Sequence, residues 1–304
     1  MKNFLTKGSV CFVTLDMGFG GAEKVIATLA NKFIQSGREV TILTLIDQND
    51  FMHALDSRVK LQTLSIKNFK MSFFALWKFF YKNEFDNFIA NIWPLTVFSF
   101  LIRFISPKTN LVLIEHCILS EQYRDKNIIF KILQKISITI FYKFAHHIIG
   151  VSMGIKNDLI AHGATKNKIS VIYNPLMPDL VNENHSINQD ILRWMEGDHI
   201  NLIAIGQLIK AKNFINLIKS IDILVNKNKQ KVRLVILGDG SERAAMNESI
   251  EKYNLENSIF LPGWVDDPMP YLRLSDLLIL SSDYEGFGLV ILEALSVGVN
   301  VVST

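Results

Sequence analysis

The sequence has 304 residues, of which 49% are hydrophobic and 20% are charged, and its formal net charge is +3. This length suits two α/β domains, and this composition excludes a largely disordered chain. The small net charge argues against nucleic acid as the main partner, because nucleic-acid-binding domains carry strong basic fields. Cys11 and Cys117 have a spacing that suits neither a metal site nor a disulfide framework, so reduced, buried thiols and a cytoplasmic location are expected.

Short apolar runs alternate with helical patterns in the first half of the chain, which is typical of βαβ units and a parallel sheet. The first strand is expected at 9–15, and the helix at 22–36 follows it with apolar residues near helical spacing. The most apolar stretch, 128–151, contains lysines and histidines, which argues against a membrane span. Further strands are expected at 39–45, 60–64, 87–91, 111–115, 147–151 and 170–173, and a second long helix at 127–144.

The alternation breaks at Asn174-Pro175 and resumes after a polar stretch, which predicts a linker at 176–198. The chain then ends on an apolar strand with no helix after it, so a truncated second domain is expected. The sequence thus predicts an N-terminal Rossmann-like domain, 1–175, and a second one, 199–304. In the second domain, strands are expected at 201–205, 232–237, 259–261, 277–280 and 300–303, and helices at 213–225, 242–253, 269–273 and 288–296.

A glycine turn, Gly18-Phe19-Gly20-Gly21, follows the first strand and opens a helix. Backbone amides at such a helix start favour an anionic ligand, although an ordinary tight turn is the alternative. The dinucleotide fingerprint requires glycine where this chain has Glu23, which disfavours a nicotinamide-dependent oxidoreductase.

Two further patterns in the second domain suit a nucleotide diphosphate. Gly206-Gln207-Leu208 follows a strand, and Lys212 lies beside the start of the next helix, where it can act as a counter-ion. Glu285 lies in a glycine-containing turn, and Glu293 lies on the apolar helix that follows, where a ribose diol would satisfy its carboxylate. The alternatives are a solvated Lys212 and a Glu293 that pairs with a structural lysine.

In this combination, the sequence resembles glycosyltransferase family 4 over essentially its whole length. The resemblance implies the GT-B fold, in which two Rossmann-like domains face each other across a cleft. The matching motifs are Gly20-Gly21-Ala22-Glu23-Lys24, Glu115-His116, Val151-Ser152, Gly206-Gln207-Leu208, Lys212-Asn213, Gly238-Asp239-Gly240, Gly263-Trp264, and Glu285 with Glu293.

The resemblance implies roles for these residues. Lys212 would neutralise the leaving diphosphate, Glu285 would bind donor-sugar hydroxyls, and Glu293 would bind the ribose. His116 would touch the donor sugar and form the catalytic set with Lys212 and Glu285. The other donor-binding residues implied are Gly206, Gln207, Trp264, Val265, Phe287, Gly288 and Leu289, and the acceptor-side loop is formed by Gly20 and Gly21.

The implied activity is metal-independent transfer of a hexosyl or N-acetylhexosaminyl group, with retention, from a nucleotide-diphosphate sugar. A UDP-sugar is expected as substrate, and no cofactor is expected. The acceptor would be a glycan or a polyprenyl- or lipid-linked saccharide. The product would belong to a bacterial surface polysaccharide, a lipopolysaccharide or a glycoprotein glycan. Gln207 departs from the family's usual arginine and removes a cation. This departure keeps open an alternative, a non-catalytic subunit that binds sugar nucleotides or a partner.

Residues 67–82 interleave lysines with seven aromatic side chains, between Lys67 and Lys82. This pattern predicts an interfacial helix and a peripheral position on the inner face of the cytoplasmic membrane. The alternative is a helix that packs its aromatic side chains on the sheet while its lysines face solvent.

Overall fold

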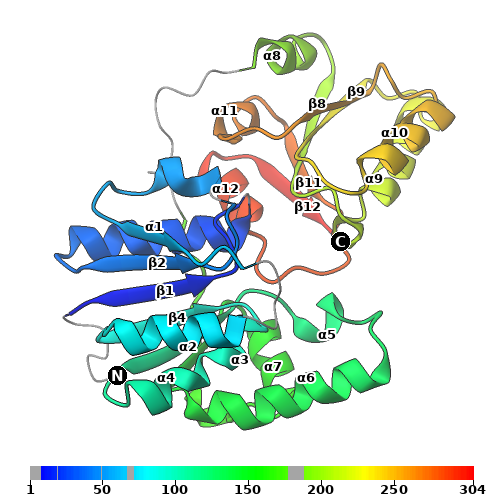
Figure 1. Ribbon diagram of the computed structural model, residues 1–304. Coiled ribbons are helices and arrows are strands. Elements are labelled where there is room, and N and C mark those ends of the chain that lie inside the picture. Colours follow the sequence, from blue (N-terminus) through cyan, green and yellow to red (C-terminus); the bar gives the residue numbers. More distant parts are fainter. Residues whose placement is uncertain (1–7, 19, 49, 67–71, 177–187) are drawn as a thin grey trace. The chain divides into compact units, whose positions relative to one another are not determined.

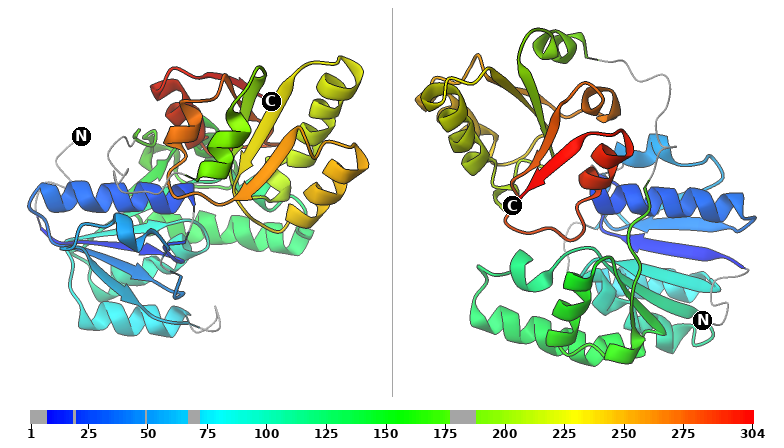
Figure 2. Two further views of the ribbon diagram at one scale, coloured as in Figure 1. Left: turned by 90° about the horizontal axis from the view of Figure 1, so that it is seen from above. Right: turned by 180° about the vertical axis from the view of Figure 1, so that it is seen from behind.

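The chain forms two compact α/β units, Met1–Pro175 and Leu176–Thr304. Figure 1 shows the computed structural model, which describes residues 8–18, 20–48, 50–66, 72–176 and 188–304. Each unit is built on its own parallel sheet, with helices on both faces (Figure 2). The predicted α/β architecture of two parallel-sheet domains is therefore confirmed.

The sheet of the first unit has seven parallel strands in the order β3-β2-β1-β4-β5-β6-β7. Strand order reverses between β1 and β4, and ligands of α/β proteins bind at the carboxyl ends of the strands beside such a point. The strands are β1 (Val10–Thr14), β2 (Val40–Thr44), β3 (Lys60–Thr63), β4 (Asn87–Asn91), β5 (Asn110–Glu115), β6 (His147–Gly150) and β7 (Ile169–Val171).

Helices cover both faces of this sheet, which is why β1, β2 and β4 are buried at every position. In Figure 1, α1 lies on one face, and α2, α4 and α6 lie on the other. The helical elements are α1 (Gly21–Gln35), η1 (Asp50–Ala54), α2 (Ser72–Lys82), α3 (Leu95–Phe98), α4 (Phe100–Ile105), α5 (Leu119–Gln122), α6 (Ile128–Phe141), η3 (Tyr142–Phe144), α7 (Met153–Ala161) and η4 (Lys166–Lys168).

The second unit has a five-stranded parallel sheet in the order β10-β9-β8-β11-β12. Its strands are β8 (Ile200–Ile205), β9 (Val232–Leu237), β10 (Ile259–Gly263), β11 (Leu277–Leu280) and β12 (Asn300–Ser303). Its helical elements are α8 (Gln189–Met195), η6 (Lys210–Lys212), α9 (Phe214–Asp222), η7 (Ile223–Lys227), α10 (Arg243–Lys252), α11 (Met269–Leu272) and α12 (Leu289–Ser296).

The alternation of side chains along β8 produces two cores, one on each face of this sheet. Leu202 and Ala204 pack with the apolar side chains of α9 and α10. Ile203, which points to the opposite face, packs with those of α8, α11 and α12. Successive side chains of a strand point to opposite faces, so a continuous apolar run in β8 fills both cores.

Helix α8 lies inside the stretch 176–198 that was predicted to be a linker. The Asn188 side chain caps this helix by accepting a hydrogen bond from the Asp190 amide at 2.9 Å. Ile191 and Met195, one helical turn apart, are buried in the core of the second unit. The linker prediction is therefore wrong for 189–195, because two apolar residues at helical spacing anchor an otherwise polar segment. Residues 177–187 of the predicted linker lie outside the described part of the chain.

Within the described part of the chain, neither Cys11 nor Cys117 forms a disulfide bond. Cys11 is buried in β1, and burial raises the pKa of its thiol. Cys117 is only partly buried, contrary to expectation, because it lies beyond the end of β5 rather than within the sheet.

Candidate functional site

The glycine turn after β1 leads directly into α1. Gly20 is the N-cap residue in an extended conformation, and its carbonyl accepts the first hydrogen bond of the helix from the Lys24 amide at 3.1 Å. A β-carbon at Gly20 would lie 2.1 Å from the Glu23 carboxylate, so the glycine makes room for this side chain. Burial raises the pKa of Glu23 to about 7. The start of α1 thus already carries a carboxyl group, which suits a ligand hydroxyl better than a pyrophosphate. Phe19 of the same turn lies outside the described residues.

His116 follows the last residue of β5 and is almost completely buried. Its Nε2 lies 3.4 Å from Oδ1 of Asn91, the last residue of β4. Among the described residues, the His116 Nδ1 has no hydrogen-bond partner. Burial lowers the pKa of His116 to about 4, so the imidazole is neutral at neutral pH. A buried neutral imidazole with one unused ring nitrogen can bind a ligand hydroxyl.

Glu115, immediately before His116, is fully buried and is held by three donors. Its carboxylate accepts hydrogen bonds from the Tyr142 hydroxyl, from the Thr96 Oγ1 at 2.9 Å and from the Trp93 amide at 3.1 Å. Burial raises the pKa of Glu115 to about 7. This network joins β5 to α3 and η3 and fixes the strand end that carries His116. The sequence signalled it only by an acidic residue at the end of an apolar strand.

In the second unit, Lys212 and Glu285 form an ion pair at the carboxyl ends of β8 and β11. The Lys212 Nζ lies 2.5 Å from Oε1 of Glu285, and the Ser282 hydroxyl donates to the same oxygen at 2.6 Å. The two charged side chains are 21% and 25% exposed, so the pair is partly shielded but remains open to a ligand. Lys212 is therefore not the solvated loop lysine of the alternative interpretation.

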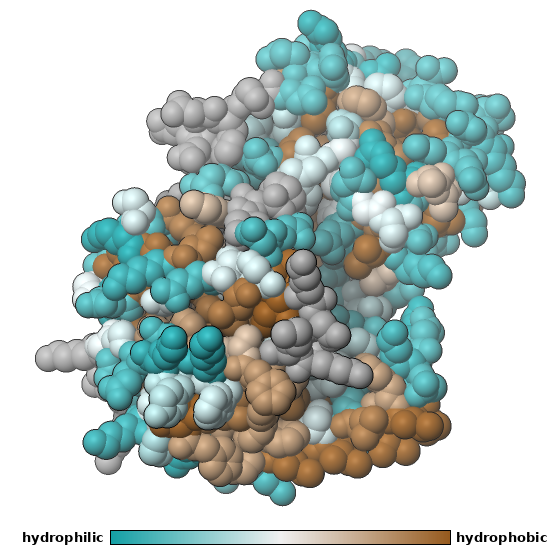
Figure 3. All heavy atoms as spheres, in the orientation of Figure 1, coloured by the Kyte–Doolittle hydropathy of each residue, from teal (hydrophilic) through white to brown (hydrophobic). Residues whose placement is uncertain are grey.

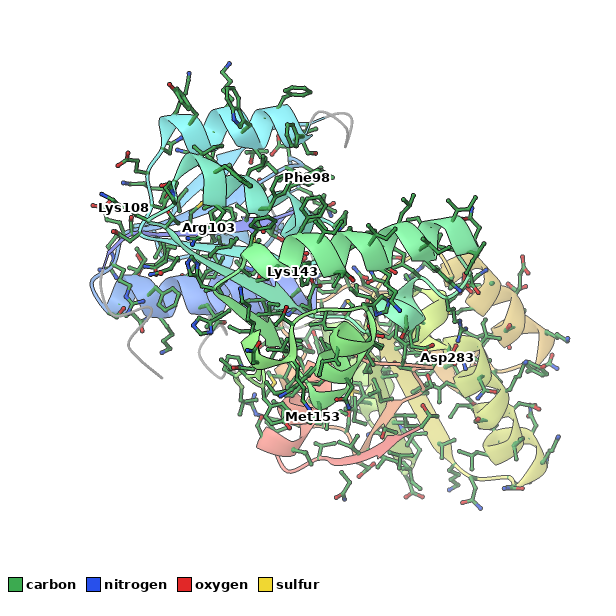
Figure 4. The ribbon with its side chains drawn as sticks, turned by 90° about the horizontal axis from the view of Figure 1, so that it is seen from below. Phe98, Arg103, Lys108, Lys143, Met153 and Asp283 are labelled. Carbon is green, nitrogen blue, oxygen red and sulfur yellow. The ribbon has the colours of Figure 1, made fainter. Side chains whose placement is uncertain are left out.

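Hydrogen bonds between two loops hold this pair in place. The Asp283 amide donates to the Ala211 carbonyl at 2.8 Å, and the Ser281 hydroxyl donates to the Lys212 carbonyl at 2.8 Å. The Asn213 side chain donates to Oδ1 of Asp283, which Figure 4 labels, at 2.7 Å. The loop after β11 is thus fixed against η6.

The loops after β8 and β9 pass each other at backbone contact. A β-carbon at Gly238 would lie only 1.9 Å from the Gly206 carbonyl oxygen, and Gly238 has a φ of +145°. Gly206 in turn supports the Lys212 stem, since a β-carbon there would lie 3.2 Å from the Lys212 Cε. Gly206 and Lys212 are therefore in contact, while Gln207 is exposed on the same loop.

Helix α12 begins at this edge of the sheet, immediately after a left-handed residue. Gly288 is its N-cap, with φ +73°, and Phe287 precedes it. Glu293 lies four residues after Leu289, the first residue of α12, and is half-buried. Trp264 and Val265 follow β10 and are also half-buried. All of these predicted donor-binding residues therefore follow carboxyl strand ends of one sheet.

Replacement of Gly288 by alanine is expected to cost about 1–2 kcal/mol of stability, because a non-glycine residue disfavours the left-handed conformation. It should also weaken nucleotide-sugar binding, since the amides at the start of α12 would shift. Gly37→Ala is a matched control, because Gly37 has φ +82° and an added β-carbon there would meet nothing within 4 Å. Equal effects of both variants on ligand affinity, measured by calorimetry, would contradict a binding role for the start of α12.

Two parallel-sheet α/β units, with a lysine–glutamate pair and glycine turns at the carboxyl edge of the second, are the features expected of a GT-B glycosyltransferase. The comparisons with known proteins support this class. Residues 19–180 match Glycosyltransferase Family 4, and residues 193–304 match Glycosyl transferases group 1. The first match covers more than half of the chain, and the chain belongs to glycosyltransferase family 4.

Two relatives with assigned names match most of the chain. The N-acetylgalactosamine-N,N'-diacetylbacillosaminyl-diphospho-undecaprenol 4-alpha-N-acetylgalactosaminyltransferase of Campylobacter jejuni is 28% identical over 95% of this chain and 78% of its own length. The amylovoran biosynthesis glycosyltransferase AmsD of Erwinia amylovora is 27% identical over 90% of this chain and 74% of its own length.

Solved structures agree in fold. HepE from Anabaena, in complex with UDP and glucose, superimposes with a TM-score of 0.77 at 20% identity, over 97% of this chain and 80% of HepE. WaaG, a glycosyltransferase involved in lipopolysaccharide biosynthesis, gives 0.72 at 14% identity, over 97% of this chain and 80% of WaaG. At these identities the agreement concerns the fold alone.

Proposed function

We propose that this glycosyltransferase moves a hexosyl or N-acetylhexosaminyl group from a UDP-sugar to a glycan or polyprenyl-linked acceptor with retention of configuration. The single observation that carries this proposal is the partly buried Lys212–Glu285 pair, a cation and a carboxylate 2.5 Å apart. A carboxylate of this kind can accept hydrogen bonds from sugar hydroxyls. A sugar diphosphate presents the complementary groups, phosphate oxygens next to sugar hydroxyls.

The chemistry assigned to the second unit is stabilisation of a leaving group. As the bond between the anomeric carbon and the UDP oxygen breaks, negative charge grows on the diphosphate. Lys212 and the amides of Phe287, Gly288 and Leu289 would stabilise that charge. The acceptor oxygen forms its bond on the same face of the sugar, and its proton passes to the departing phosphate oxygen. Glu285 would hold the sugar hydroxyls and Glu293 the ribose, with Trp264 and Val265 beside the base.

From the first unit, His116 would bind a hydroxyl of the donor sugar through its unused Nδ1. Gly20 and Gly21 would shape the acceptor side, where the Glu23 carboxyl group can receive a hydroxyl donor. No step in this scheme requires a divalent cation or a cofactor. Among the described residues, no group of three His, Cys, Asp or Glu side chains is spaced to hold a metal ion.

The proposed acceptor follows the names of the relatives, and the proposed location follows from an acceptor that is linked to a lipid. The Campylobacter jejuni enzyme is named for a diphospho-undecaprenol acceptor, and AmsD is named for amylovoran biosynthesis. We therefore assign this chain to assembly of a bacterial surface polysaccharide, lipopolysaccharide or glycoprotein glycan on the cytoplasmic face of the inner membrane. Of the segment 67–82, α2 exposes Phe74, Trp77 and Tyr81, which supports membrane contact; residues 67–71 lie outside the described part.

A thermal-shift screen of UDP-, GDP- and ADP-sugars tests the donor class. At a hundredfold excess over the dissociation constant, a bound donor adds about 3 kcal/mol of stability, and the melting temperature should rise by roughly 5–10 °C with a UDP-sugar. The rise should be smaller for Glu285→Ala. Failure of all three classes to stabilise the protein would remove the transferase proposal.

Product analysis separates catalysis from the alternative of a non-catalytic binding subunit, which Gln207 keeps open. With a diphospho-undecaprenol-linked saccharide as acceptor, the wild-type chain should form a product with the donor's anomeric configuration, seen by NMR. Donor binding without transfer or hydrolysis would favour the binding subunit, and an inverted product would exclude retention.

A further inference from the structure

Helix α6 exposes a stripe of six aliphatic side chains along its length. Spacings of three and four residues link them along one side of the helix. Each of the six is between 46% and 67% exposed, whereas Gln134 and Ile138, on the opposite side, are buried. The stripe consists of Ile128, Ile129, Ile132, Leu133, Ile136 and Ile140. Figure 3 shows these apolar residues gathered along the lower edge of the first unit. A soluble surface rarely exposes so many aliphatic side chains together, so this stripe is expected to meet a partner.

The charged residues on this helix and directly after it are positive, whereas residues 121–126 before it carry both signs. Lys131 and Lys135 lie on α6 itself, which contains no acidic residue, and Lys143 lies in η3 directly after it. Figure 4 labels Lys143 together with Arg103 of α4. Lys135, Lys143 and Arg103 are exposed. A helix with one aliphatic side and a lysine border has the composition of an interfacial helix that lies on an anionic bilayer.

The apolar surface continues from α6 towards α2. The ring of Phe100 in α4 is tilted against that of Phe141 in α6, with centroids 4.6 Å apart. The exposed ring of Phe104 lies 5.6 Å from that of Phe144 in η3, also between centroids. Helix α4 also packs against α2. Trp77 and Tyr81, the exposed rings of α2, are the residue types that prefer the headgroup region. Aliphatic, aromatic and basic residues therefore share one side of the first unit.

We propose that the α6 stripe is the main membrane-docking surface of this protein and that its partner is an anionic lipid bilayer. The stripe runs along the length of α6, so docking would place this helix parallel to the membrane surface. No described helix is long and apolar enough to cross a membrane. A second copy of the chain would bring two sets of lysines together, whereas anionic headgroups complement them. The inference rests on the proposed function only for the location of the acceptor and not for the chemistry of transfer.

Vesicle flotation of the full chain tests this proposal. The wild type should bind vesicles of phosphatidylcholine with phosphatidylglycerol more tightly than vesicles of phosphatidylcholine alone. Ile132→Gln with Ile136→Gln should weaken binding to both by about tenfold or more, because binding scales with the apolar area that enters the interface. Lys135→Gln with Lys143→Gln, which removes two exposed lysines, should weaken binding by about fivefold per lysine, on the anionic vesicles only.

Two matched controls lie in the second unit. Ile223→Gln with Leu274→Gln removes apolar side chains that are 46% and 50% exposed, the same fractions as Ile136 and Ile132. Lys219→Gln with Lys227→Gln removes two exposed lysines. Both control pairs should bind vesicles like the wild type. Transfer to a water-soluble acceptor should persist in the α6 isoleucine variant, so that loss of docking and loss of catalysis can be told apart.

Wild-type binding by the α6 isoleucine variant would overturn the proposal. The proposal would also be wrong if the wild type sedimented as a dimer and the α6 isoleucine variant as a monomer, while both bound vesicles equally. The stripe would then be an interface between two copies of the chain.

Discussion

Replacing Lys212 by alanine is expected to lower kcat for sugar transfer by about a thousandfold, the cost of losing one charged stabiliser of a transition state. The effect should be large because Gln207 carries no charge and leaves Lys212 as the cation in contact with Glu285. Lys212→Arg should recover only part of the rate, since a guanidinium does not fit where an ammonium contacts Glu285. Steady-state kinetics with the UDP-sugar and a water-soluble acceptor give the measurement.

The Lys212→Ala variant should keep its fold, because the lysine side chain packs mainly on Gly206 and Glu285 and not in either core. Lys219→Ala is the control: this lysine lies on α9, is exposed, and should leave kcat unchanged. A Lys212→Ala rate within a few-fold of the wild type would show that the leaving diphosphate is stabilised by other groups.

The strands could be predicted because each is a short apolar run between turn residues. The ranges predicted for β4, β9, β11 and β12 coincide with the strands observed. In a sheet covered on both faces, nearly every strand position is apolar, so the run itself marks the element. Helix α8 was missed because only Ile191 and Met195 of its residues are buried, too few to mark it as a helix within a polar stretch.

The site was predictable in position but not in its contacts. Topology places a residue after the carboxyl end of a parallel strand, which located His116, Gly206 and Glu285 in advance. The Lys212–Glu285 contact joins residues 73 positions apart, and no local pattern encodes it. The family resemblance implies that the lysine binds the diphosphate and the glutamate binds the sugar. In the structure, the lysine and the glutamate contact each other. Likewise, the donors to Glu115 come from two separate segments, 93–96 and η3.

Glu115 is expected to make the stability of the protein fall as pH rises from about 4.3, the ordinary pKa of a glutamate in an unfolded chain, to about 7. Burial raises the pKa of Glu115 to about 7 in the folded state. Between these two values, the folded chain holds a proton that the unfolded chain has released, so unfolding becomes easier as pH increases. The loss is about 3 kcal/mol once the pH exceeds the folded pKa.

Urea unfolding of the full chain at pH 4.5 and pH 7.5 measures this loss against Glu115→Gln, which has no proton to release at this position. The unfolding free energy of the wild type should fall relative to the variant by about 3 kcal/mol over this range. The pKa of Glu23 is also raised to about 7, but Glu23 is present in both proteins and its contribution cancels. Glu248→Gln, which removes an exposed carboxylate on α10, is the control and should give a pH profile parallel to that of the wild type.

The hydrogen bonds around Glu115 can accommodate both protonation states. The Thr96 and Tyr142 hydroxyl oxygens lie 2.6 Å apart, and either can be the donor. When the Glu115 carboxyl group gains a proton, it can donate a hydrogen bond to one of these two hydroxyls, and that hydroxyl can donate to the second one. The Trp93 amide still donates to the other carboxyl oxygen of Glu115. Parallel profiles for the wild type and Glu115→Gln would instead mean that three donors keep the carboxylate ionised throughout. In that case the network would hold a permanent buried charge beside His116, and the histidine pKa would lie above the value of about 4 that burial alone gives it.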